Sequence, residues 1–196
     1  MPDKNIKIGE KIRGLRISKG LSIAQVSQQS GIAESTLYSI EGHLVSPPLG
    51  NLVGLANVFE VSVGDFFGEG GDSPYCLVRS DNRKTVSRFD STGGNSGGYS
   101  YESLGQQKKN RHMEPFLVTL TPTEYPQAEP NQHIGEEILF VLEGKVDVRL
   151  LDRTETLNPG DSIYYDSTMP HVVSCHGNEP ATILAVIYAK DEMIIL

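Results

Sequence analysis

The spacing of apolar residues changes once along this chain, and the change limits what the chain can fold into. Between residues 6 and 67 apolar side chains recur at helical spacing, as Ile8, Ile12 and Leu15 do. Beyond residue 74 short segments alternate apolar and polar residues instead, as VDVRL does at 146–150. The sequence therefore predicts a multidomain protein in which an α-helical unit precedes an all-β unit.

Glycines and prolines divide the first unit into five predicted helices. Gly20 and Gly31 each follow the last periodic residue of a helix, where glycine commonly ends one. The Pro-Pro pair at 47–48 interrupts the chain before the fourth helix. Ser62 can cap a short fifth helix that ends near Phe67.

Composition marks the division between the two units. GEGGDS at 68–73 has the glycine and serine content of a linker. We therefore expect a helical domain at 1–67, a linker at 68–73 and a β domain at 74–196. Short apolar runs bounded by Gly, Pro and Asn fill this last range. Many short strands in about 120 residues favour a closed barrel or a jelly roll.

The composition is that of a folded soluble protein, with 38% hydrophobic and 21% charged residues in a chain of 196. No apolar run approaches the roughly 18 residues that are needed to span a bilayer. The N-terminal sequence, MPDKNIKIGEKIRG, lacks the apolar core of a secretory signal. We therefore expect a cytoplasmic protein that makes no contact with membranes.

The net charge of −8 is unevenly distributed. Residues 1–19 carry six Lys or Arg and two acids, a balance of +4, whereas residues 71–196 carry 11 basic and 18 acidic residues, a balance of −7. A basic end on an acidic body suits a small nucleic-acid footprint, because the acidic part is kept away from phosphate. A solvated helix face would give the same local charge, so charge alone does not decide between the two.

A helix, a glycine turn and a second helix follow one another within LSIAQVSQQSGIAESTLYSIEG at 21–42. This is the layout of a helix-turn-helix, whose tight turn lets the second helix enter the major groove of DNA. The second helix is predicted to expose short polar side chains, which can reach base edges near a helix N-terminus. A helical bundle that serves only protein contacts is the alternative.

SIAQVSQQSGIAESTLYSIEGH, followed by SPPLGNL, resembles the Xre-like, phage-repressor type of helix-turn-helix over residues 6–67. The resemblance implies a homodimer that reads two half-sites of a double-stranded operator about one helical turn apart. It places a phosphate contact on Gln25 and pairs Arg16 with Glu41 in a structural role. The other residues expected to contact DNA are Glu34, Ser35, Thr36, Tyr38 and Ser39.

Glu34 is a departure from what DNA contact usually requires. A carboxylate can accept a hydrogen bond from cytosine N4, but it repels phosphate. An acid in the first turn of a helix also stabilises the helix dipole without any role in DNA binding. Both interpretations of Glu34 stay open.

NQHIGEEILFVLEG at 131–144 places metal-ligand residues at the start of a predicted strand. In a straight strand the Cα atoms of His133 and Glu137 would be about 13 Å apart, whereas ligand atoms lie about 2.0–2.2 Å from one ion. Gly135 permits a bend or bulge that would fold His133 back over Glu137. His171, after DSTMP, is the best candidate for a third ligand. A simple ion pair at a barrel rim is the alternative.

EILFVLEG and PGDSIYYDSTMPH resemble the two sequence motifs of the cupin family, and the resemblance extends over about 115–195. It implies a double-stranded β-helix, or jelly-roll, barrel that binds a divalent metal through His133, Glu137 and His171. Asn131 replaces the first of the two histidines that this family usually has. Two imidazoles and one carboxylate leave three positions of an octahedral metal open for small ligands. The resemblance implies Fe, Zn, Mn or Ni as the metal, and the ligand residues do not distinguish among these four.

Two tyrosines of YSYESL at 99–104 alternate and therefore share a face of a predicted strand. They can line a ligand pocket or simply fill the barrel. The cupin resemblance places Tyr101 near the metal. Together with Asn131, Tyr101 is a candidate for contact with a bound ligand.

The order of the two domains resembles the cupin-bearing Xre-like regulators along nearly the whole chain. This implies a transcriptional regulator whose barrel binds a small-molecule effector. The same architecture occurs in 2-hydroxypropylphosphonate epoxidase, a mononuclear non-haem iron oxygenase, whose iron-binding segments resemble HIGEEILFVLEG and the later PH. That enzyme also uses a lysine of its helical domain, whereas this chain has Gly20 at that position and Lys19 one place away. The departure favours the regulator over the enzyme.

Overall fold

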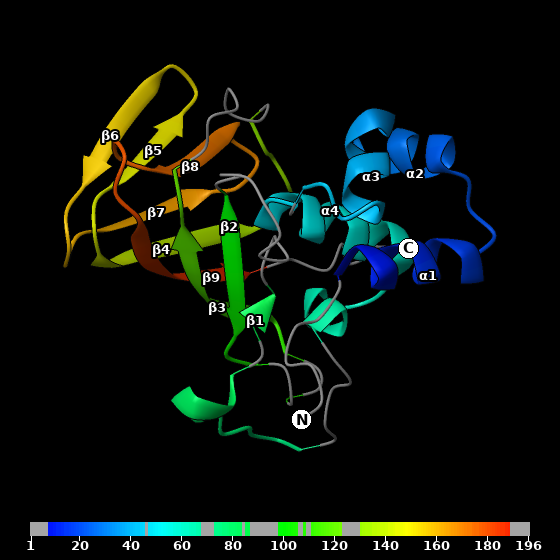
Figure 1. Ribbon diagram of the computed structural model, residues 1–196, viewed down its shortest axis with the longest axis horizontal. Coiled ribbons are helices and arrows are strands. Elements are labelled where there is room, and N and C mark those ends of the chain that lie inside the picture. Colours follow the sequence, from blue (N-terminus) through cyan, green and yellow to red (C-terminus); the bar gives the residue numbers. More distant parts are fainter. Residues whose placement is uncertain are drawn as a thin grey trace, which may run out of the picture.

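The computed structural model describes residues 8–45, 47–67, 73–83, 85–86, 98–105, 108, 111–122 and 130–188. Helices occupy the first part of the described chain and strands the second, as the change in periodicity predicted (Figure 1). Among the described residues, no helix has the length and apolar character that crossing a membrane requires.

The described residues of the helical domain form four α-helices: α1 (Ile8–Ser18), α2 (Ile23–Ser30), α3 (Glu34–Glu41) and α4 (Leu49–Phe59). The start of α2 is a capping box, in which the Ser22 hydroxyl accepts from the Gln25 N–H while the Gln25 side chain accepts from the Ser22 N–H. Gly31 ends the helix with φ of 74°, a conformation that glycine adopts without steric cost. The predicted turn at Gly31 is thereby confirmed.

The prediction of five α-helices is wrong. The segment after Ser62 forms a 3-10 helix, η1 (Val63–Phe67), in place of a fifth α-helix. The Asp65 carboxylate accepts hydrogen bonds from the N–H and the hydroxyl of Ser62, and the Asp65 N–H donates to the Ser62 carbonyl. These bonds span three residues, so they favour the tighter winding of a 3-10 turn. The expected linker at 68–73 lies outside the described residues except for Ser73.

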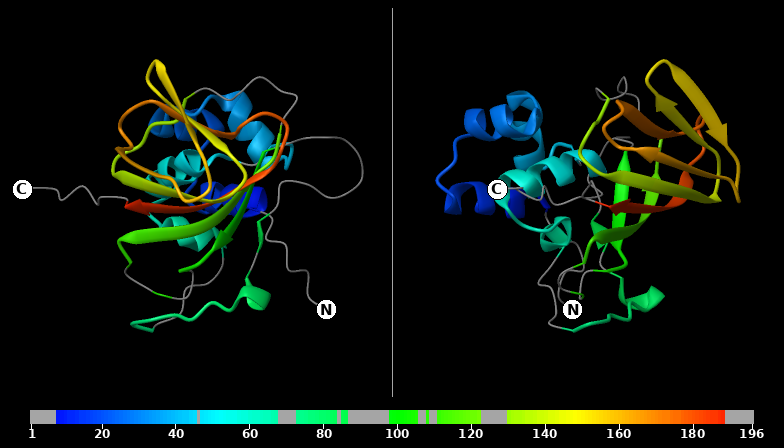
Figure 2. Two further views of the ribbon diagram at one scale, coloured as in Figure 1. Left: turned by 90° about the vertical axis from the view of Figure 1, so that its left-hand side faces the viewer. Right: turned by 180° about the vertical axis from the view of Figure 1, so that it is seen from behind.

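In the described part of the chain, nine strands form two antiparallel sheets (Figure 2). The six-stranded sheet has the order β1-β2-β3-β9-β4-β7, and the three-stranded sheet has the order β6-β5-β8. The first comprises β1 (Thr85–Val86), β2 (Tyr99–Ser103), β3 (Met113–Leu120), β9 (Ala181–Tyr188), β4 (Glu136–Glu143) and β7 (Ser162–Asp166). The second comprises β6 (Arg153–Leu157), β5 (Val146–Leu150) and β8 (His171–Cys175). A second 3-10 helix, η2 (Ser80–Asn82), precedes β1.

The predicted alternation of strand residues is confirmed. In β5 the buried residues are Val146 and Val148, and in β9 every second residue is buried from Ala181 to Ile187. The inward side chains of both sheets belong to one hydrophobic cluster. The core of the β-sheet domain therefore lies between the two sheets.

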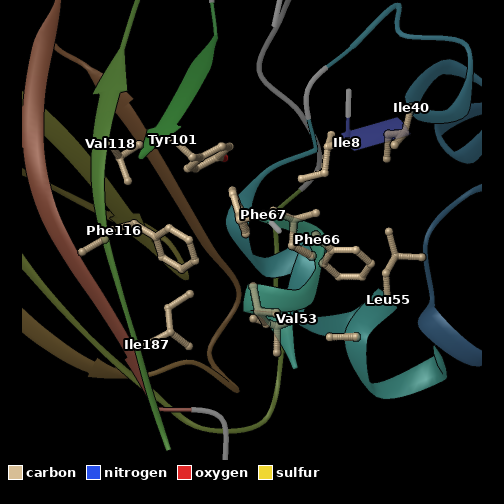
Figure 3. Packing of buried hydrophobic residues seen from close by; sticks show 14 of the residues in the cluster. Ile8, Ile40, Val53, Leu55, Phe66, Phe67, Tyr101, Phe116, Val118 and Ile187 are labelled. Carbon is tan, nitrogen blue, oxygen red and sulfur yellow. The ribbon is translucent and has the colours of Figure 1, made fainter. Parts of the chain in front are cut away.

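The same cluster continues into the helical domain (Figure 3). Phe67 of η1 packs against Phe116 and Tyr101, with ring centroids 4.9 and 6.5 Å apart, respectively. Phe66 turns the other way and meets Phe59 of α4 at 6.5 Å. Aromatic pairs of this kind contribute about 0.5–1.5 kcal/mol each beyond their burial. The two adjacent phenylalanines thus join the cores of the two domains.

Candidate metal centre and DNA-reading helix

A bend before β4 brings His133 over Glu137. Gly135 has φ of 119°, and its carbonyl accepts from the Ser167 N–H at 2.9 Å, while the His133 N–H donates to the Ser167 carbonyl at 2.9 Å. The bend places His133 Nε2 2.7 Å from Glu137 Oε1. The predicted role of Gly135 is confirmed, since a straight strand would hold the two side chains apart.

His171 reaches the same point from β8. Asn131 and His171 form a two-residue bridge in which each N–H donates to the other carbonyl at 2.9 Å. His171 Nε2 lies 4.0 Å from Glu137 Oε1, and all three side chains are buried. The three residues that the sequence singled out therefore converge on one point.

Backbone carbonyls orient the two imidazoles. His171 Nδ1 lies 2.8 Å from the Met169 carbonyl oxygen, and His133 Nδ1 lies 3.3 Å from that of Ile134. With a metal bound, a proton on each Nδ1 would leave the Nε2 atoms, which face Glu137, as the atoms offered to the ion; without a metal, His133 Nε2 carries the proton of its hydrogen bond to Glu137.

Tyr165 holds the carboxylate of the triad. It lies opposite Glu137 in the register of β7 with β4, and its hydroxyl donates to Glu137 Oε2. Burial and the negative charge of Glu137 raise the pKa of Tyr165, so the hydroxyl stays protonated and donates. Sequence reasoning missed this residue. Strand parity within SIYYD separates the two tyrosines, but which of them faces inward depends on the register with β4.

The protonation states of the triad suit a metal. Burial alone would raise the pKa of Glu137, but the hydrogen bond from His133 and the charges of both histidines outweigh burial and lower it. Burial lowers the pKa of His171. A carboxylate and a neutral imidazole are the forms that bind metals.

The donor set fits a divalent ion. One ligand atom from each of His133, Glu137 and His171 lies within 4.8 Å of the other two. An ion with bonds of about 2.0–2.2 Å holds neighbouring donors roughly 3 Å apart, so small side-chain movements suffice. Two imidazoles and a carboxylate suit first-row divalent metals. The buried triad is thus compatible with a metal site.

A cavity of about 40 Å³ adjoins the triad, and the N-terminal end of α4 forms one wall of it. Gly50 makes the closest approach, because a Cβ there would lie 2.9 Å from Asn131 Cβ and 3.1 Å from His133 Cδ2. The rest of the wall is mostly apolar: Val118, Leu120, Leu139, Val173, Ile183 and Ala185. No Lys or Arg of the described residues lines this cavity. The helical domain therefore closes one side of the candidate site.

Both predicted ligand-contact residues, Tyr101 and Asn131, line the cavity. The Tyr101 ring is buried and stacks on Tyr99 with a centroid distance of 6.0 Å and an interplanar angle of 7°. Its hydroxyl donates to the Pro47 carbonyl, just before α4, at 3.1 Å. Tyr101 therefore connects the sheet wall of the cavity to the helical domain.

The helix-turn-helix exposes the predicted DNA-contacting residues to different degrees. Gln25, Glu34, Ser35 and Tyr38 are exposed, whereas Thr36 and Ser39 are half-buried. The Ser39 hydroxyl donates to the Ser35 carbonyl, and Oε1 of Gln25 is engaged in the capping box. The capping box therefore uses the side-chain oxygen of Gln25 and does not use its amide nitrogen.

The predicted pair of Arg16 and Glu41 is confirmed. Arg16 Nε lies 2.6 Å from Glu41 Oε1 and Nη2 lies 2.8 Å from Oε2, so the pair is bidentate. Arg16 Nη1 also donates to the Leu21 carbonyl at 3.1 Å. The pair ties α1 to the end of α3. Lys19, by contrast, pairs with exposed Glu60 at 3.0 Å and does not line the cavity.

Residues 12–66 match the Helix-turn-helix family, and residues 116–187 match the Cupin domain family. With the helices, sheets and buried triad described above, these matches define a DNA-binding transcriptional regulator of the Xre-like class that carries a cupin domain. The chain is similar to the HTH-type transcriptional regulator PuuR of Escherichia coli (strain K12), with 28% identity over 191 residues, 96% of this chain and 97% of that protein.

Two solved structures are similar to this chain to different degrees. An HTH_3 family transcriptional regulator from Vibrio cholerae has a TM-score of 0.63 and 24% identity, covering 95% of this chain and 97% of that one. Hydroxypropylphosphonic acid epoxidase from S. wedmorenis has a TM-score of 0.48 and 23% identity, covering 94% of this chain and 98% of that one. The first similarity supports the arrangement of helices and sheets. The TM-score of the second is too low to support any conclusion about this chain.

Proposed function

We propose that this regulator senses a small metabolite in its cupin domain and transmits the occupancy of that site to its DNA-binding helices. In this proposal residues 1–67 bind DNA, residues 68–73 are a linker, and residues 74–196 form a double-stranded β-helix (jelly-roll) barrel. The chain works in the cytoplasm, where its operator DNA is. The contact of Gly50 with the Asn131 and His133 side chains carries the proposal, because it joins the helical domain to the site directly.

The proposed sensor holds a divalent metal through His133, Glu137 and His171. Imidazole and carboxylate ligands support Fe, Zn, Mn or Ni, whereas Ca²⁺ and Mg²⁺ prefer oxygen ligands alone. When bound, the metal supplies a positive centre with open positions for oxygen or nitrogen atoms of the effector. Asn131 and Tyr101 are proposed to contact the effector beside it.

The size of the cavity explains why an effector would act on α4. A space of about 40 Å³ holds a few water molecules at most. A metabolite of several heavy atoms therefore fits only if the first turn of α4 moves away from Asn131. Movement of α4 changes the position of the domain that carries α3, and a coupling free energy of about 1–3 kcal/mol between two such sites is typical.

At the DNA, α3 is proposed to enter the major groove and α2 to contact the backbone. Base edges are read by the α3 residues, and Gln25 at the start of α2 contacts phosphate. The residues proposed to contact DNA are Gln25, Glu34, Ser35, Thr36, Tyr38 and Ser39. A homodimer that presents two copies of α3 would read two half-sites.

Binding to the DNA upstream of the protein's own gene, measured by band shift, tests this proposal. We expect sequence-specific retention at moderate salt and an affinity that differs at least about fivefold between metal-loaded and EDTA-treated protein. Gly50→Ala, which pushes α4 off the site, should reduce that difference. Gly54→Ala is the matched control, because its Cβ would come no closer than 3.7 Å to any neighbour. Absence of sequence-specific retention would refute the proposal.

A non-haem iron oxygenase of the phosphonate epoxidase type is the second candidate, and the donor set of the triad is the observation that favours it. The placement of Lys19 weighs against it, because no described cation reaches the cavity to hold a phosphonate. An oxygenase should consume oxygen when Fe(II) and a phosphonate substrate are added. No change in oxygen concentration at the electrode would exclude this second function.

A further inference from the structure

The outer face of the six-stranded sheet is apolar where a sheet facing water usually carries polar residues. The outward positions of β4 are Ile138, Phe140 and Leu142, and they are 39–43% exposed. The inward positions of the same strand are occupied by Glu137 and by core residues. ILFVL is therefore apolar on both faces, which is the pattern of a strand that is covered on both sides.

The strand register extends this apolar surface sideways. Across β4, Ile138 lies opposite Val186 of β9 on one side and Tyr164 of β7 on the other. Val186 in turn lies opposite Pro115 of β3, so one outward row crosses four strands.

A second row runs beside the first. Phe140 lies opposite Leu184 of β9, and Leu184 lies opposite Leu117 of β3. Neighbours within a row lie about 4.8 Å apart across the strands, and the two rows lie about 7 Å apart along the strands, so they form one continuous apolar patch. The exposed charged side chains of these strands stand at the two ends of the patch, Glu136 and Asp166 at one end and Glu143 at the other.

The patch is large for a surface that faces only water. Six large side chains of the patch and of the row of Glu136 beside it are at least 37% exposed: Met113, Ile138, Phe140, Leu142, Tyr164 and Tyr188. Together they expose roughly 400–700 Å², taking about 150–250 Å² for one fully exposed large side chain. That is at the upper limit of what monomers leave open. With its half-buried neighbours and rim, the face approaches the roughly 800 Å² per partner that a stable dimer needs.

We propose that this face is the surface through which two copies of the chain associate. A second copy fits because the centre of the face carries no charge, so two such centres can meet without burying an unpaired ion. Two twisted sheets of this kind pack face to face at about 30° with their side chains interdigitated. The inference extends the proposed function, since a two-fold operator needs a dimer, but it is measured independently of DNA.

Sedimentation equilibrium of the full chain, with Phe140→Glu and the control Leu151→Glu, tests the surface. Leu151 is 60% exposed in the turn between β5 and β6, outside the patch. We expect a mass twice 21.4 kDa for the unmodified chain and for Leu151→Glu. Phe140→Glu should weaken the dimer by at least about 30-fold, as loss of a central apolar anchor does. A monomeric unmodified chain, or a folded Phe140→Glu variant that dimerises as tightly, overturns the proposal.

Hydroxyl-radical footprinting of the unmodified chain covers the case in which Phe140→Glu does not fold. Raising the protein concentration through the dissociation midpoint should protect Met113, Phe140 and Tyr164. Protection of these residues that does not depend on concentration would mean that another part of the same chain covers the face, and would overturn the proposal. A chain that dimerises through this face but gives no sequence-specific band shift would contradict the proposed DNA binding and would not contradict the proposed dimer surface.

Discussion

The guanidinium of Arg111 occupies the space in which a side chain at Gly64 would begin. Arg111 Nη2 lies 1.2 Å from the position that a Cβ on Gly64 would take. Arg111 Nε pairs with Glu114 Oε2 at 2.7 Å, and the Gly64 N–H points to Glu114 Oε1 at 3.4 Å. This cluster holds η1, at the end of the helical domain, against β3 of the β-sheet domain.

Gly64→Ala should destabilise the chain by about 2 kcal/mol or more, because the new methyl group displaces a buried guanidinium. Arg111→Ala should itself cost about 3–5 kcal/mol, because it leaves the Glu114 carboxylate buried without its partner. In the Arg111→Ala background, Gly64→Ala should cost less stability than it costs in the unmodified chain, because the Arg111 guanidinium no longer occupies the space of the new methyl group. Urea unfolding of the double-mutant cycle measures the difference, and additive costs would contradict the assigned contact.

Two glycines of α1 should respond oppositely to alanine. A Cβ on Gly9 would lie 2.2 Å from the Ile40 carbonyl oxygen of α3, whereas a Cβ on Gly14 would meet nothing within 4 Å. Gly14→Ala should stabilise the chain by about 0.5–1 kcal/mol through helix propensity. Gly9→Ala should destabilise it, because α1 must move off α3. Thermal unfolding compares the two, and equal shifts would refute this packing.

Arg16→Lys should lower the free energy of unfolding by about 1.5–3 kcal/mol, because a lysine cannot make the bidentate contact to Glu41. The two side chains are 15% and 9% exposed, so solvent replaces little of the loss. Lys19→Ala is the contrast, since its partner Glu60 is 82% exposed and such pairs contribute little. Chemical denaturation of both variants checks the contrast.

Metal binding should require His171 and not His176. His171→Ala removes a buried donor of the triad, whereas His176 is half exposed and pairs with Asp147 outside it. Metal at about 100 times its dissociation constant should add about 2.7 kcal/mol of stability to the unmodified chain and to His176→Ala, and EDTA should remove it. Calorimetric titration with Zn²⁺ measures the affinities, and equal affinities of the two variants would contradict the triad.

The pH dependence of that binding follows from the lowered pKa of His171. Its usual value is 6.5, and burial lowers it. A neutral imidazole therefore persists in the folded chain to a pH below 6.5. This histidine should therefore not limit metal affinity above that pH, and it should protonate only as the pH drops through its lower folded value. Histidine NMR of the metal-free chain measures this, and protonation of His171 at or above pH 6.5 would show that burial does not govern it.

Tyr165→Phe should weaken metal binding about 10–100-fold, as removal of a group that orients a ligand usually does. The Tyr165 hydroxyl holds Glu137 Oε2, and the variant leaves that oxygen without its donor. Tyr164→Phe is the matched control, because its hydroxyl bonds to Glu136 on the outer face. The ratio of the metal affinities of the two variants measures how much Tyr165 contributes by positioning Glu137. A ratio near one would contradict this role of Tyr165.

Several features of the fold depend on chemistry that acts within a few residues of the chain, and these were predictable. The ends of α2 depend on the Ser22 hydroxyl and on the left-handed backbone of Gly31. The bend at Gly135 is local in the same way. The predicted number of helices is wrong where local signals are weakest, because five residues after Ser62 can wind into either kind of helix and the Asp65 bonds decide.

By itself, then, the sequence determined the change from helices to strands, the helix-turn-helix, and the identity of His133, Glu137 and His171, since these follow from periodicity, short turns and motif spacing. The tertiary structure alone decided that Tyr165 supports the triad, that Gly50 closes its cavity, that Arg111 fills the space over Gly64, and that the outer face of β4 lies open. Each of these depends on which distant segments meet and in what register, and a one-residue shift of register turns every side chain of a strand to its other face.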